Sequence, residues 1–127
     1  MTPAWPGGGL RGLRILVVED EALIAMLLED MLAALGCVVV GPIPRLGPAL
    51  SAARTGELDC AVLDVNLHGK AVLPVADVLE RRGIPFLFVT GYGEIDADPR
   101  FAKSPLVRKP FKIDEIADAL AQLMRAE

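Results

Sequence analysis

Residues 58–69 of the chain have the sequence LDCAVLDVNLHG. The apolar run from Cys60 to Leu63 is short and is bounded by polar residues and glycine, a pattern typical of a buried parallel strand. Asp64 follows this run directly. Ligands of open α/β sheets bind outside the carboxyl ends of the strands, so Asp64 lies where chemistry is expected. A single Asp at this place is also a common turn-capping residue, and the other strands must decide between the two interpretations.

Similar apolar runs alternate with helical patterns along the chain. We expect five strands, at Arg14–Val18, Cys37–Val40, Cys60–Leu63, Ile84–Val89 and Leu106–Arg108. We expect helices at Glu21–Leu35, Arg45–Arg54, Pro74–Arg82 and Lys112–Arg125. This alternation predicts an α/β fold with a doubly wound parallel sheet, and five strands favour the flavodoxin-like order 2-1-3-4-5. The glycines and prolines from Gly91 to Ser104 leave room for only a short or irregular fourth helix.

The composition restricts the classes of function. The 127 residues predict one domain at 13–127, after a flexible tail at 1–12 that is rich in proline and glycine. A net charge of −4 without a basic cluster argues against nucleic acid as a partner. The two cysteines, Cys37 and Cys60, lie in apolar runs and are expected to be buried free thiols. No apolar run reaches the roughly 18 residues of a membrane span and no signal peptide is recognisable, so we expect a cytoplasmic protein without a membrane partner.

The helix predicted from Glu21 to Leu35 is apolar on more than one face. Its expected core stripe, at helical spacing, consists of Ile24, Leu27, Leu28, Met31 and Leu35. Further apolar residues lie off this stripe: Ala22, Leu23, Ala25, Met26 and Leu32. Either some of these side chains form an exposed apolar patch, or the helix is buried more deeply than most surface helices. The sequence leaves both interpretations open.

Polar residues stand at the carboxyl ends of four predicted strands. Glu19 and Asp20 follow the first strand, Asp64 the third, Thr90 the fourth and Lys109 the fifth. In the order 2-1-3-4-5 the first and third strands are neighbours, so three carboxylates would share one pocket. Their like charges repel one another unless a cation lies among them.

These residue types match the chemistry of Mg²⁺ and of phosphoryl transfer. Mg²⁺ binds carboxylate oxygens and water, and the backbone carbonyl of Asn66, just past the turn, would add a neutral oxygen ligand. Lys109 brings a positive charge and Thr90 a hydroxyl to the same rim. Because carboxylates act as covalent phosphoryl acceptors, the pocket would hold a phosphoryl group on Asp64.

In this order along the chain, Glu19-Asp20, Leu63-Asp64, Thr90 and Lys109-Pro110 resemble the receiver domain of two-component response regulators. The resemblance extends from about Leu13 to Arg125. It implies a signalling domain, not an enzyme, in which Asp64 accepts a phosphoryl group from a histidine kinase. The implied Mg²⁺ ligands are Glu19, Asp20, Asp64 and the Asn66 carbonyl.

The resemblance also assigns roles at the rim of the pocket. It implies that Thr90 moves to bond the phosphoryl oxygen and that Lys109 pairs with the phosphoryl group. The bond between Lys109 and Pro110 resembles the cis peptide of the family. His68, in the loop after the phosphoacceptor, is expected to shape the rim without reacting itself.

Two features distinguish this sequence from ordinary receivers and indicate a subgroup of the family. Leu106 stands three residues before the lysine, where ordinary receivers have an aromatic switch residue. The stretches FVTGY (residues 88–92) and DVNL (residues 64–67) resemble the alphaproteobacterial FAT GUY receivers, with Val89 in place of their alanine. This subgroup implies a single-domain or kinase-attached receiver, an HWE-type histidine kinase as partner, and a mobile region in place of the fourth helix. Tyr92 either replaces the missing aromatic switch or is an ordinary surface tyrosine.

The resemblance predicts a protein-binding output. No DNA-binding or catalytic segment follows the last predicted helix, so we expect output by protein–protein contact or a role as a phosphate shuttle or sink. Receivers of this kind meet the helical hairpin of the kinase with their first helix. The predicted partner face therefore consists of Ala22, Ala25, Met26 and Glu29.

Other classes of protein fit parts of the pattern. A haloacid-dehalogenase-like phosphatase also uses a strand-end Asp with Mg²⁺, but it needs a second acid two residues later, where this chain has Asn66, and a substrate cap. A flavodoxin-type cofactor binder needs a phosphate loop rich in Ser, Thr and Gly after the first strand. A pseudo-receiver binds partners without being phosphorylated, and the complete acidic set argues against it.

Overall fold

The computed structural model describes residues 10–67, 70–91 and 104–125. Its main sheet consists of β1 (Arg14–Val18), β2 (Val38–Ile43), β3 (Cys60–Asp64), β6 (Phe86–Thr90) and β7 (Leu106–Arg108). The strands are ordered β2-β1-β3-β6-β7, and every pair of neighbours is parallel. The predicted doubly wound sheet and its 2-1-3-4-5 order are confirmed.

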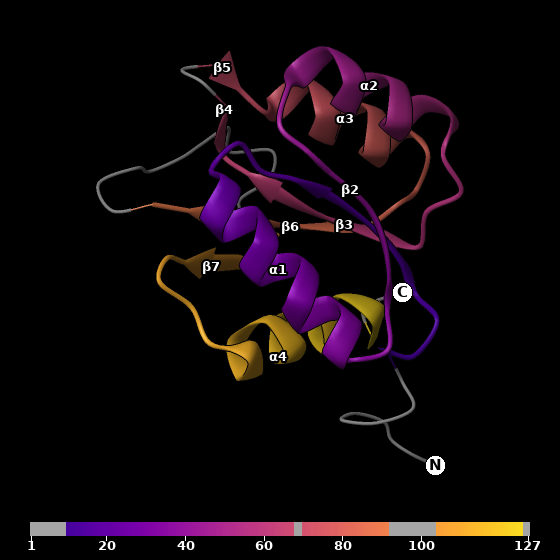
Figure 1. The fold of residues 1–127 in the computed structure, drawn as a ribbon. Helices are drawn as coiled ribbons and strands as arrows, with labels where there is room; N and C mark the ends of the chain where they lie inside the picture. Colours follow the sequence, from indigo (N-terminus) through magenta and orange to yellow (C-terminus); the bar gives the residue numbers. More distant parts are fainter. Residues whose placement is uncertain (1–9, 68–69, 92–103, 126–127) are drawn as a thin grey trace.

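The described helices cover both faces of the sheet (Figure 1). α1 (Ala22–Ala34) and α4 (Ile113–Arg125) pack on one face, and α2 (Leu46–Thr55) and α3 (Leu73–Arg81) on the other. Because successive strand residues point to opposite faces, Ile15 and Val17 join the first core while Leu16 and Val18 join the second. A strand covered on both sides must be apolar at every position, and this explains the continuous apolar runs in the sequence.

β2 is longer than the sequence predicts. It continues through Gly41 and Pro42 to Ile43, where we expected a break after Val40. β2 is an edge strand, and an edge strand tolerates a proline that cannot donate to a neighbour. Gly41 has a φ of 108°, and a Cβ there would lie 2.9 Å from the carbonyl oxygen of Val17, so the close approach requires glycine. The extension supports the end of β1, because the Ile43 carbonyl accepts a hydrogen bond from the Glu19 N–H at 3.0 Å.

α1 leaves part of its apolar surface exposed. Leu28 and Leu32 are buried, and Ile24, Met31 and Leu35 pack against the same core. The predicted stripe was therefore wrong in including Leu27, which is 39% exposed, and in omitting Leu32. Leu23 and Met26 are 80% and 59% exposed, so the interpretation as an exposed apolar patch is confirmed.

The two leucines give a matched pair for a stability measurement. We expect Leu32→Ala to lower the free energy of unfolding by about 3 kcal/mol, because it removes a fully buried side chain. Leu27→Ala, in the same helix, should change it by less than about 1 kcal/mol. Urea denaturation followed by circular dichroism measures both values, and equal losses would contradict the observed orientation of α1.

The packed part of the chain begins before the predicted domain boundary. Leu10 is only 2% exposed, and the Gly12 N–H donates to the Gly36 carbonyl at 2.7 Å. The division into a tail at 1–12 and a domain at 13–127 stays a prediction, and residues 1–9 of that tail lie outside the described residues. Cys37 and Cys60 are buried free thiols as predicted, and burial raises the pKa of Cys60 to about 12.

A small hairpin lies next to the end of β3. β4 (Asn66–Leu67) and β5 (Lys70–Ala71) pair antiparallel where the sequence predicted only a turn. The observed helix boundaries lie within one residue of the predicted ones. Within the described ranges, every helix is too short or too polar to cross a membrane.

Candidate functional site

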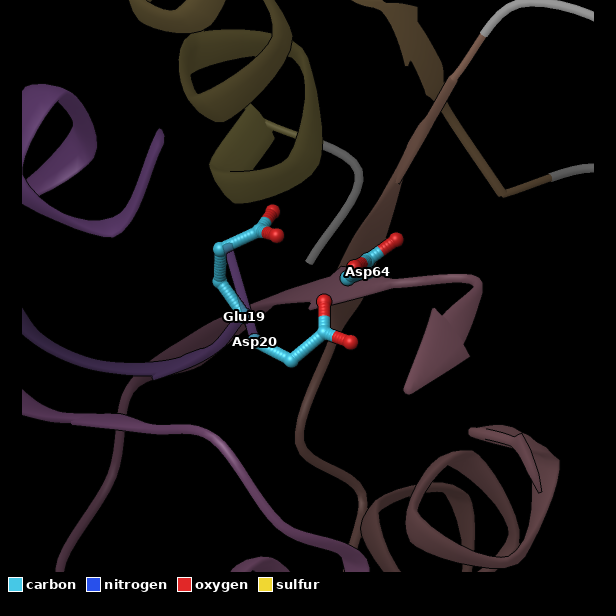
Figure 2. Close-up of side chains that lie close together, drawn as sticks. All are labelled: Glu19, Asp20 and Asp64. Carbon is cyan, nitrogen blue, oxygen red and sulfur yellow. The ribbon is translucent and has the colours of Figure 1, made fainter. Parts of the chain in front are cut away.

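Three carboxylates meet at the carboxyl ends of β1 and β3 (Figure 2). Glu19 and Asp20 follow β1, and Asp64 is the last residue of β3. Because β1 and β3 are paired with Val18 opposite Leu63, their ends lie side by side. One oxygen from each carboxylate lies within 4.8 Å of the other two. The predicted cluster of three carboxylates is therefore present.

One oxygen of this cluster lacks a hydrogen-bond partner. Glu19 is 1% exposed, and its Oε1 has no partner among the described residues. Its Oε2 accepts hydrogen bonds from the Glu21 N–H at 3.1 Å and from Lys109 Nζ at 3.3 Å. A buried, unsatisfied carboxylate oxygen is costly. A hard divalent cation binds carboxylate oxygens, so the donor set fits Mg²⁺.

Lys109 lies at the edge of this cluster and contacts three carboxylates. Its Nζ lies 2.6 Å from Glu21 Oε1, 3.3 Å from Glu19 Oε2 and 3.7 Å from Asp64 Oδ2. Burial alone would lower the pKa of the lysine, but the hydrogen bond to Glu21 and the charges of Asp64 and Glu19 raise it above its ordinary value. The ammonium is therefore charged at neutral pH.

The raised pKa of Lys109 predicts a pH dependence of stability. Below the pKa of an unfolded lysine, about 10.4, the ion pairs of Lys109 contribute their full stabilisation of the fold. This stabilisation is lost as the pH rises through the higher pKa of Lys109 in the folded state. We therefore expect the difference in free energy of unfolding between the wild type and Lys109→Met to shrink above about pH 10.4. Urea denaturation with a chelator present, at a series of alkaline pH values, measures this difference. A difference that grows with pH would contradict the assignment.

Thr90 and Lys109 are brought together by the pairing of β6 with β7. Thr90, the last residue of β6, is 1% exposed, and its carbonyl accepts a hydrogen bond from the Lys109 N–H at 2.9 Å. Its hydroxyl donates to the Gly91 carbonyl at 3.4 Å. The bond between Lys109 and Pro110 is cis, as the resemblance implies.

The structure also places the predicted partner face and Asn66. In the predicted partner face, Ala22, Met26 and Glu29 are exposed and Ala25 is half-buried. Asn66 lies in β4, two residues after Asp64, and the role of its carbonyl stays a prediction.

Other predicted residues fall outside the described part of the chain. They are His68, Tyr92 and most of the segment predicted as a short or irregular fourth helix.

Sequence reasoning did not identify Glu21, the nearest carboxylate to Lys109. It was predicted as the first residue of a helix, and it is the N-cap of α1. The available signal was its position as the third acid in the run Glu19-Asp20-Glu21 after β1.

Comparison with known proteins decides the family. Residues 15–121 match the family model described as the response regulator receiver domain. The chain belongs to this family. Receiver domains bind Mg²⁺ at an acidic pocket and are phosphorylated by histidine kinases, and they are in general signalling domains, not enzymes. Membership favours the receiver interpretation over the phosphatase.

Solved structures and curated proteins give the same result. The solution structure of SdrG from Sphingomonas melonis Fr1 is 44% identical, with a TM-score of 0.82, over 92% of this chain and 99% of that one. Nodulation protein W of Bradyrhizobium diazoefficiens is 32% identical over 84% of this chain and 48% of its own length. The phyllosphere-induced regulator PhyR of Methylorubrum extorquens is 32% identical over 87% and 43%. The chain spans about half the length of these two curated relatives.

Proposed function

We propose that this receiver domain accepts a phosphoryl group on Asp64 from a histidine kinase in a Mg²⁺-dependent reaction. The observation that carries the proposal is the cluster of Glu19, Asp20 and Asp64, with one unsatisfied buried oxygen and with Lys109 beside the acceptor. Three clustered carboxylates repel one another and do not favour folding, whereas a divalent cation is bound by such oxygens.

Each side chain has a role in the transfer. A carboxylate oxygen of Asp64 bonds to phosphorus while the bond from phosphorus to the histidine nitrogen of the kinase breaks, and the histidine leaves with that electron pair. Bound Mg²⁺, held by Glu19, Asp20, Asp64 and the Asn66 carbonyl, would offset the charge of the phosphoryl oxygens.

The rim residues stabilise the product. Lys109 pairs with the phosphoryl group, and the Thr90 hydroxyl turns from the Gly91 carbonyl to donate to a phosphoryl oxygen. It is part of the same proposal that the domain assists its own phosphorylation and dephosphorylation.

The proposal extends to the subgroup and the partner. The stretch from Phe88 to Tyr92 and the similarity to SdrG over nearly all of that chain support a FAT GUY receiver with an HWE-type kinase. A solved structure titled as the BeF3-activated conformation of SdrG is 46% identical to this chain. The same proposal includes output by protein contact or phosphate shuttling in the cytoplasm, without binding to nucleic acid or membranes. It also includes a switch role for Tyr92.

Intact-mass spectrometry tests the proposed reaction. The wild-type protein is incubated with acetyl phosphate, once with Mg²⁺ and once with a chelator. We expect a gain of one phosphoryl group only when Mg²⁺ is present. Mg²⁺ binding without any gain in mass, from acetyl phosphate or from an HWE-type kinase, would indicate a pseudo-receiver instead.

The exposed patch on α1 predicts the contact with the kinase. Met26 is 59% exposed, and we expect Met26→Asp to slow phosphotransfer from the cognate kinase by about tenfold or more, because a charge replaces an apolar contact. Phosphorylation by acetyl phosphate should be unchanged. Val38→Asp, a similar change at an exposed apolar residue on β2, is the control. Equal kinase rates for Met26→Asp and the wild type would remove α1 from the partner face.

A further inference from the structure

The nearest partner of Lys109 is a carboxylate outside the acidic cluster. Lys109 Nζ lies 2.6 Å from Glu21, compared with 3.3 Å from Glu19 and 3.7 Å from Asp64. The Glu21 side chain is 60% exposed, whereas those of Glu19 and Asp64 are 0% and 3% exposed. The shortest ion pair of the lysine is therefore with the exposed carboxylate and not with either of the two buried ones.

The start of α1 holds Glu21 in this position. Glu21 is the N-cap residue, but its side chain makes no capping hydrogen bond. The backbone N–H of Glu21 donates to Glu19 Oε2, which fixes the backbone of Glu21 beside the cluster. The carboxylate of Glu21 is then free of a capping role and contacts Lys109. Glutamate is not among the residues preferred at an N-cap, and capping therefore does not explain its presence.

Lys109 and a divalent cation would compete for the same carboxylates. Glu19 Oε2 accepts a hydrogen bond from Lys109, and Asp64 Oδ2 is within ion-pair distance of it. A divalent cation bound to these carboxylates would repel the ammonium. Glu21 offers the ammonium a counter-charge outside the cluster, so that Lys109 can leave Glu19 and remain paired.

We propose that Glu21 is the positioning residue for Lys109. It holds the ammonium at an exposed carboxylate, which weakens the competition of Lys109 with a divalent cation for Glu19 and Asp64, and it yields the ammonium when Asp64 carries a phosphoryl group. The inference rests on the proposed function, because it assigns Glu21 a role in the same site.

A double-mutant cycle on Mg²⁺ binding tests this role. Isothermal titration with Mg²⁺ alone is carried out on the wild type, Glu21→Gln, Lys109→Met and the double variant. We expect Glu21→Gln to weaken Mg²⁺ binding by about three- to tenfold when Lys109 is present, because the ammonium then turns toward Glu19 and Asp64. In the Lys109→Met background the same change should weaken it by less than about twofold.

Two further variants separate contact from charge. Asp30→Asn removes an exposed carboxylate elsewhere on α1 and should leave the affinity for Mg²⁺ within about twofold of the wild type. Glu21→Asp keeps the charge but shortens the side chain by one methylene, and it should bind Mg²⁺ more weakly than the wild type. Wild-type affinity in Glu21→Asp would overturn the inference.

The outcome of the cycle is independent of phosphorylation. An equal loss of Mg²⁺ affinity with and without Lys109 would mean that Glu21 acts only through its charge. No loss in either background would mean that Glu21 does not act on the cation site. Either result overturns the inference. If the wild type binds Mg²⁺ but accepts no phosphoryl group, the proposed function fails while the cycle still reports on Glu21. If the wild type binds no Mg²⁺, both proposals fail.

Discussion

The Asp64→Asn variant is expected to take up no phosphoryl group from acetyl phosphate or from a phosphorylated kinase. Asparagine has nearly the same shape as aspartate, so it should occupy the same buried position at the end of β3. Its amide is not a nucleophile toward phosphorus, and the reaction loses the atom that forms the new bond. The loss should be complete within the sensitivity of intact-mass spectrometry.

A matched control separates loss of chemistry from loss of structure. Asp59 immediately precedes β3, at the end opposite to Asp64, and its Oδ2 accepts a hydrogen bond from the Arg14 N–H. We expect Asp59→Asn to be phosphorylated like the wild type. Circular dichroism should show the wild-type fold for both variants. Phosphorylation of Asp64→Asn at the wild-type level would place the acceptor elsewhere.

The second large effect is expected at the cation site. Asp20→Asn removes one of the three clustered carboxylates, and it should weaken Mg²⁺ binding by about a hundredfold or more. A cation that binds only the folded state raises stability as its concentration exceeds the dissociation constant. Millimolar Mg²⁺ should therefore raise the melting temperature of the wild type and leave that of Asp20→Asn unchanged.

Thermal unfolding with and without Mg²⁺ checks this prediction. Asp30→Asn, an exposed carboxylate on α1, is the control and should respond to Mg²⁺ like the wild type. Phosphorylation of Asp20→Asn should fall together with cation binding. A variant that keeps the wild-type response to Mg²⁺ would show that Asp20 is not a ligand.

Most of the sheet and the site could be predicted from the sequence because buried parallel strands leave a strong signal. An apolar run such as residues 60–63 ends where the strand reaches the polar edge, and the residue at that point, Asp64, is then placed by the fold. The same logic placed Glu19, Thr90 and Lys109. Once the order of the strands is known, their ends must meet.

The errors occur where local patterns do not decide the structure. Gly41 and Pro42 carry strong break signals, but β2 is an edge strand and continues through them. Leu27 and Leu32 both fit a helical period with Leu28, and only packing against α4 and the sheet decides which of them is buried.

Glu21 was missed because its contact is not local. It reaches Lys109 across 88 residues of sequence, and the contact depends on the angle at which α1 leaves β1. No periodicity of the sequence reports that angle. The position of Glu21 as a third acid beside a predicted metal site indicates a candidate site residue, but it does not identify Lys109 as the partner.

The central claim, phosphorylation of Asp64, is tested most directly by identifying the residue that carries the phosphoryl group. The protein is phosphorylated with acetyl phosphate and Mg²⁺, reduced with borohydride, digested and sequenced by tandem mass spectrometry. An aspartyl phosphate is an acyl phosphate, and borohydride reduces it to homoserine. We expect homoserine at position 64 and aspartate at positions 20 and 59. Homoserine at another position, or a phosphoryl group that survives reduction on a serine or threonine, would contradict it.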